Sequence, residues 1–90
     1  MAKAIVDPDE LRQFALELKR FNTELQSRLA SMQGRLSALG QSWRDQEHDR
    51  FVEEFQDTMK TLVRFTEASE RHIPFLLRKA ERIDEYLKQR

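Results

Sequence analysis

The residues whose types and spacing could do chemistry gather at the middle of the chain. His48 follows Asp45 by three residues, which is the acid-x-x-His spacing of carboxylate metal sites in helical bundles. Such a site also needs inward-facing acids from a second helix, whereas the stretch expected to face His48 contains Leu36, Ala38 and Leu39. We therefore interpret Asp45 as a helix cap and His48 as a semi-buried side chain, and we expect no metal.

The sequence lacks the residues that other kinds of catalytic or cofactor-binding site require. Cysteine is absent, which excludes thiol nucleophiles and disulfides. The sequence has no nucleophile with a base and an orienting group, and it has no glycine-rich phosphate loop. The clustered phenylalanines fit a helical core better than a ligand pocket. We predict that the protein is not an enzyme and that it binds no cofactor.

Composition and charge narrow the class of protein further. The 90 residues include 16 Lys and Arg and 16 Asp and Glu, so no net positive charge favours nucleic acid as a ligand. Hydrophobic residues make up 39% of the chain, and two Gly and two Pro leave long stretches free of helix breakers. No apolar run is long enough to span a membrane. Residues 1–6 are too short for a signal peptide, so we expect any export to proceed without one.

A first long helix is predicted over about residues 8–39. Asp7 can cap it and Pro8 suits its first position. Apolar residues then recur every seven positions, which predicts one continuous amphipathic helix; they are Leu11, Leu18, Leu25, Met32 and Leu39. Gly34 lies off this row, where it either is a tolerated surface glycine or marks the close approach of another backbone.

A second helix is predicted over about residues 45–88, after a bend over about residues 40–44. Either Ser42 or Asp45 can cap it. Its apolar stripe recurs in steps of three and four residues and includes Met59, Leu62, Ile73, Leu76 and Ala80. Pro74 predicts a kink, because the stripe keeps its phase from Ile73 to Ala80. Thr66 and Ser69 fall on that stripe, where they either bond to backbone carbonyls one turn earlier or specify register.

The whole chain, residues 1–90, is thus predicted to be a single all-α domain: an antiparallel two-helix hairpin. The apolar arc of the second helix is broader than a two-helix seam requires, which predicts dimerisation into a four-helix bundle. The predicted seam of that bundle is formed by Phe51, Phe55, Met59 and Leu62.

The end of the second helix is predicted to extend past the first. Folding the chain about residue 42 places Leu11 near residues 73–75, so the helix from Leu76 onward overhangs, with at most the lead-in of residues 1–6 to cover it. Tyr86 lies on nearly the opposite side from the apolar row of this overhang. We predict a C-terminal docking surface there, formed by Leu76, Leu77, Ala80, Ile83, Tyr86 and Leu87.

The bend carries a family resemblance. Leu39-Gly40-Gln41-Ser42-Trp43-Arg44-Asp45, followed by Phe51 and Phe55, resembles the bend of the Trp-x-Gly family of helical hairpins, the early-secretory-antigen-like (Esx-like) substrates of type VII secretion. The likeness extends over nearly the whole chain, from Ile5-Val6-Asp7-Pro8 onward. Two positions depart from the family pattern: Asp45 stands at the glycine position, and Arg90 stands where the C-terminal Tyr-x-x-x-acid export motif, read from Tyr86, has its acid.

The resemblance implies a function through binding of proteins. It implies hairpins that pair with themselves or with a related hairpin, a secretion ATPase as a further partner, and residence in the cytoplasm before export without a cleaved signal peptide. Trp43 marks the bend, either as core at the end of the bundle or as a partly exposed anchor for a partner. The alternative function is a cytoplasmic adaptor or assembly subunit that is never exported and is built on the same hairpin.

Overall fold

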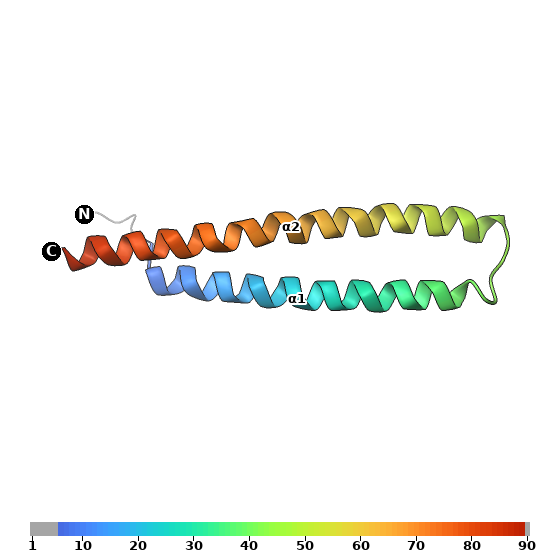
Figure 1. Cartoon of the computed structure of the whole chain (residues 1–90), viewed down its shortest axis with the longest axis horizontal. Coiled ribbons are helices and arrows are strands. Elements are labelled where there is room, and N and C mark those ends of the chain that lie inside the picture. Colours follow the sequence, from blue (N-terminus) through green and yellow to red (C-terminus); the bar gives the residue numbers. More distant parts are fainter. Residues whose placement is uncertain (1–5, 90) are drawn as a thin grey trace.

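The protein is a long antiparallel hairpin of two helices. The structure, a computed structural model, describes residues 6–89, so most of the expected lead-in and Arg90 lie outside the described residues. Helix α1 spans Pro8–Leu39 and helix α2 spans Gln46–Lys88, and they lie side by side along a molecule of 69 × 18 × 18 Å (Figure 1). The predicted all-helical hairpin is confirmed. No helix within the described residues is both long and apolar enough to cross a membrane.

Helix α1 begins at the cap that its sequence predicts. The side chain of Asp7 accepts a hydrogen bond of 2.9 Å from the backbone N–H of Asp9, and Pro8 occupies the first turn. Asp9 and Glu10 follow, at the end of the helix where the macrodipole favours negative charge. This start fixes the end of α1 that lies farthest from the bend.

The link between the helices is short and capped on both sides. The N–H of Trp43 donates to the carbonyl of Leu39 at 3.0 Å, which closes the last turn of α1. Asp45 is the N-cap of α2, because its carboxylate accepts a hydrogen bond of 3.0 Å from the N–H of His48. Ser42, the other candidate cap, instead donates to the carbonyl of Leu39 at 3.4 Å.

Helix α2 runs from Gln46 to Lys88 without a break at Pro74. Its buried residues all belong to the predicted three-and-four-residue stripe, and they are Met59, Thr66, Ser69 and Ala80. On α1 the buried residues are Ala15, Asn22 and Leu36. These three share seven-residue spacing with the half-buried Leu29, whereas Met32 and Leu39 of the predicted row remain exposed.

Two helices cover only a narrow core. Among the described residues, the buried apolar side chains are Ala15, Leu36, Met59 and Ala80, two of which are alanines. A chain of this size removes a modest fraction of its surface from water. Many large apolar side chains are consequently left at the surface of the single hairpin.

The overhang of α2 is shorter than predicted. The last turns of α2 do extend past the start of α1 (Figure 1), but the guanidinium of Arg12 pairs with the carboxylate of Asp84, so the predicted start of the overhang at Leu76 is too early. Ala80 has an exposed fraction of 0%, and Leu76 and Ile83 are half-buried. The cause is the position of the fold, which lies slightly past residue 42: the contacts of Phe21 with Phe65, Gln33 with Gln56 and Asn22 with Ser69 have midpoints at about residues 43, 44–45 and 45–46. A shift of the fold point by one residue moves the facing position on α2 by two.

Candidate interaction surface

One side of the hairpin gathers six of the thirteen exposed large hydrophobic side chains of the described residues, four of them phenylalanines. We call it the aromatic face, and it comprises Phe14, Phe21, Met32, Leu39, Phe51 and Phe65, all exposed. The α1 members lie beside the half-buried row of Leu11, Leu18 and Leu25. At about 100° per residue these positions fall on the same flank of the two-helix seam. Large exposed apolar patches of this kind mark interaction surfaces in soluble proteins.

Ring contacts join the two helices along this face. Phe21 of α1 and Phe65 of α2 meet edge to face with ring centroids 6.0 Å apart. Near the bend, Trp43, Phe51 and Phe55 form a row with centroid distances of 5.8 and 5.5 Å. Both geometries are favourable for aromatic pairs. The face is therefore preformed, although Phe21 is still 50% exposed and Phe65 47% exposed.

The face is hollowed at the end away from the bend. A groove of about 360 Å³ lies between the helices there. Its lining is mainly apolar and comprises Phe14, Leu18, Phe65, Ala68, Ser69, His72, Phe75 and Leu76. The groove can accept side chains from an opposing surface, as knobs enter holes between packed helices.

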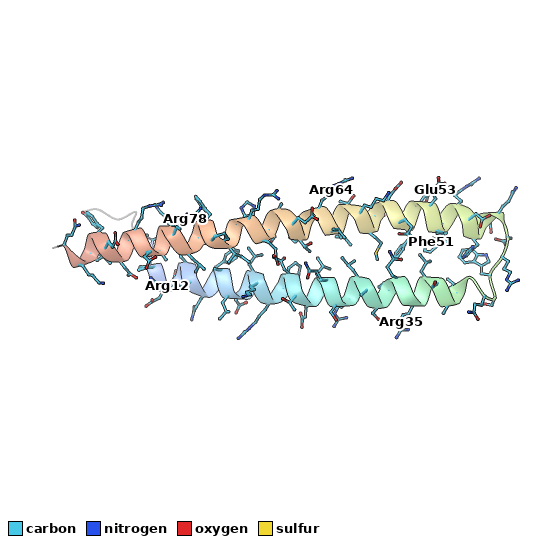
Figure 2. All side chains as sticks on the ribbon, in the orientation of Figure 1. Arg12, Arg35, Phe51, Glu53, Arg64 and Arg78 are labelled. Carbon is cyan, nitrogen blue, oxygen red and sulfur yellow. The ribbon has the colours of Figure 1, made fainter. Side chains whose placement is uncertain are left out.

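The predicted seam residues divide between two surfaces. Met59 is buried and also lines a groove on the other side of the hairpin, so it packs within the single chain. Phe55 and Leu62 are half-buried, and Phe51 is exposed. Figure 2 shows Phe51 on the side of α2 that is turned toward α1. Of the four residues, Phe51 offers the most surface to a second molecule.

The opposite side of the hairpin carries the polar contacts between the helices, beside exposed Leu16 and Val63. The amides of Gln33 and Gln56 exchange two hydrogen bonds across the helices, at 3.2 and 3.3 Å. Farther along, Arg12 bridges Asp9 of its own helix and Asp84 of α2. The hydrogen bond to Asp84 raises the pKa of the Arg12 guanidinium, with smaller contributions from neighbouring carboxylates. These polar groups are already paired within the chain.

The bend places the rings of Trp43 and His48 together. Their rings meet at 72° with centroids 5.1 Å apart, and both side chains are half-buried. The Nδ1 atom of His48 lies 3.5 Å from Asp49, while Asp45 is engaged as the cap. Residues 6–89 contain no group of three or more His, Cys, Asp or Glu side chains suited to a metal ion. Trp43 thus combines partial burial with a place at the end of the aromatic row.

The predicted C-terminal docking surface stays a prediction, and its residues differ in exposure. Leu77, Tyr86 and Leu87 are exposed, Leu76 and Ile83 are half-buried, and Ala80 is buried. Sequence reasoning also missed a buried residue: Asn22, which donates from its amide to the hydroxyl of Ser69 at 3.0 Å. Asn22 belongs to the seven-residue series of Ala15, Leu29 and Leu36, which could have indicated its burial. It was overlooked because only apolar residues were considered as core candidates on α1.

Comparison with known proteins agrees with this geometry. A family model described as proteins of 100 residues with WXG matches residues 4–86. No curated protein and no solved structure is similar enough to this chain to give a match. The matched range takes in α1, the bend with Trp43 and α2 as far as Tyr86.

Proposed function

The chain belongs to the WXG100 family of small helical proteins of type VII secretion, and we propose that it acts as a dimer of hairpins paired through the aromatic face. Proteins of this family typically pair with each other. The observation that carries the proposal is the preformed but uncovered contact of Phe21 with Phe65. Burying apolar surface of this extent is the main favourable contribution to association.

The edges of the aromatic face favour a second copy of this chain as the occupant. Along α1 the exposed acids Glu10 and Glu17 precede the exposed bases Arg28 and Arg35. Along α2 the exposed acids precede the base too; they are Glu47 and Glu54, followed by Lys79.

In an antiparallel hairpin this order makes the face self-complementary. A two-fold axis along the hairpin sets the α1 edge of one copy against the α2 edge of the other, and acid then meets base at both ends. A two-fold axis across the hairpin sets each helix against its own counterpart in reverse, and acid again meets base. Such pairing adds orientation and specificity to an interface that apolar burial stabilises. Figure 2 shows Arg35 on the side of α1 turned away from α2, where it can reach a partner.

The dimer would serve secretion, as a substrate or as a partner of substrates. Family membership supports a secretion-linked role that includes contact with a secretion ATPase and residence in the cytoplasm before export. A non-exported adaptor built on the same hairpin is the second candidate, favoured by Arg90 at the position of the family's C-terminal acid. Protein binding without catalysis is common to both.

Two experiments test the proposal. Sedimentation equilibrium of the isolated full chain at micromolar concentration is expected to give about twice the mass of one chain, which is 10.8 kDa. A fully helical monomer under those conditions would overturn the dimer. Tagged protein in the culture medium of unlysed cells supports export, whereas retention of the tagged protein in cells with an active secretion system supports the adaptor.

A further inference from the structure

The outer side of the C-terminal half of α2 carries a second patterned surface. We call it the arginine seam, and it comprises Arg64, Arg71, Phe75, Arg78, Arg82 and Tyr86, all exposed. Figure 2 shows Arg64 and Arg78 along the edge of α2 that faces away from α1. The arginines of the seam lie on the back of the hairpin and stay accessible when the aromatic face is covered, whereas Phe75 borders both surfaces because it also lines the groove of that face.

The spacing of the seam is that of a helix-packing surface. With Ala68 included, its positions follow one another by four and three residues alternately, from Arg64 to Arg82, and Tyr86 extends the row. At about 100° per residue they span an arc of roughly 80°, and at 1.5 Å per residue the seam is about 33 Å long. A straight row of this period suits a second helix lying along it.

The charge of the seam is segregated and unpaired. The acids of the same stretch fall on the neighbouring arc, and they are Glu67, Glu70, Glu81, Asp84 and Glu85. Within residues 6–89 the ion pairs use Arg12 and His48 as their cations, and no seam arginine takes part in one. Interaction with the helix macrodipole does not explain the pattern, because that effect is confined to the last turn, whereas Arg64 and Arg71 lie far from Lys88.

We propose that the arginine seam docks an acidic helix of another protein. Arginine is the residue of choice for bidentate recognition of carboxylates, and arginine with aromatic residues is the composition enriched at protein interfaces. The occupant would carry carboxylates at the same alternating spacing and an apolar side chain against Phe75. An anionic membrane fits less well, because the apolar stripe of α2 faces α1 and leaves Phe75 and Tyr86 alone to insert. Nucleic acid fits less well because acids flank the seam.

The test uses the full chain and a helical probe peptide. The probe is an alanine-based helix of about 22 residues, which matches the seam in length, with glutamates on one face and a central leucine. A control peptide of the same composition has its glutamates spread around the helix. Fluorescence anisotropy is expected to show tighter binding of the patterned peptide, with a dependence on salt.

Variants locate the binding on the chain. The double variant Arg71→Glu with Arg78→Glu is expected to weaken binding of the patterned peptide by about tenfold or more. Lys19→Glu with Arg20→Glu on α1 changes the net charge equally at exposed positions and is expected to stay within about twofold. Arg71→Ala with Arg78→Ala gives the same test without introduced repulsion, and circular dichroism verifies helicity in every variant.

Three outcomes would overturn the proposal. The first is equal binding of the two peptides. The second is an equal loss in the seam and the α1 variants, which would indicate nonspecific attraction. The third is preference for phosphatidylglycerol vesicles or duplex DNA over the patterned peptide. The outcome is independent of dimerisation, because sedimentation of the seam variants is expected to match that of the unchanged chain.

Discussion

The side-chain amide of Asn22 on α1 donates a hydrogen bond to the hydroxyl oxygen of Ser69 on α2, 3.0 Å away, midway along the hairpin. Asn22 has an exposed fraction of 0%, and its Oδ1 atom finds no donor among the described residues. Thr66, also buried, donates to the carbonyl of Val63 at 2.7 Å. A polar pair in an apolar seam penalises sliding of one helix past the other, because sliding buries unpaired groups. The pair therefore specifies the register that sets Phe21 against Phe65.

Removing one partner of this pair is expected to destabilise the hairpin. Ser69→Ala leaves the buried Asn22 amide without its acceptor, which costs about 1–3 kcal/mol. Urea unfolding followed by circular dichroism measures the free energy of unfolding. Protein concentration is held fixed, because dimerisation adds to the apparent stability.

The matched double variant separates a polar penalty from loss of packing. Asn22→Leu with Ser69→Ala removes both polar groups and is expected to recover most of the loss, to within about 1 kcal/mol of the unchanged chain. If the double variant has as low a free energy of unfolding as Ser69→Ala, the position requires the shape of asparagine rather than its hydrogen bond.

Changes at Asp45 are expected to show that it acts as a cap. Asp45→Ala removes the acceptor for the N–H of His48 and is expected to cost about 1 kcal/mol. Asp45→Gly restores the family's Trp-x-Gly pattern and is expected to cost only about a few tenths of a kcal/mol relative to aspartate. Thermal unfolding of both variants provides the comparison. Equal losses from alanine and glycine would contradict the role of the side-chain cap.

Gly34 lies exposed in the interior of α1, and a Cβ atom added there would meet no atom within 4 Å. In the single hairpin this glycine therefore lies on open surface, in agreement with the interpretation of a tolerated surface glycine. Gly34→Ala is expected to stabilise the protein by about 0.5–1 kcal/mol, because alanine loses less backbone entropy in a helix. Urea unfolding detects this gain. A loss of stability, or a loss of dimer by sedimentation, would instead indicate that another backbone approaches Gly34 in the assembly.

The hairpin followed from the sequence because its signals are local. Asp7 and Pro8 at one helix start, Asp45 at the other and the apolar periodicity each act within a few residues. Which residues of the two helices face each other could not be predicted, because that pairing depends on the number of residues in the link. The contacts between the helices place the fold point at about residues 43–46 rather than at 42, and Ala80 of the predicted overhang is buried.

The centre of the α1 seam was missed for a different reason. Asn22 holds a central position, and a search for apolar spacing passes over a buried amide whose partner, Ser69, lies 47 residues away along the chain. For Ser69 the sequence left two interpretations, a bond within its own helix, as Thr66 makes, or a role in register, and the contact with Asn22 favours the second. Long-range polar pairing of this kind is visible only once the two helices are placed against each other.

A charge introduced into the aromatic face is expected to separate the proposed dimer while leaving the hairpin folded. Phe21 and Leu16 are both about half exposed on α1, but Phe21 lies on the aromatic face and Leu16 on the other side. Phe21→Asp buries a carboxylate against the partner and is expected to raise the dimer dissociation constant by about 100-fold, as at an interface hot spot. Leu16→Asp should leave that constant within about twofold, because its side chain remains in water. Sedimentation equilibrium measures both constants, and circular dichroism at high concentration verifies helicity. Equal effects of the two substitutions would mean that the hairpins pair through another surface.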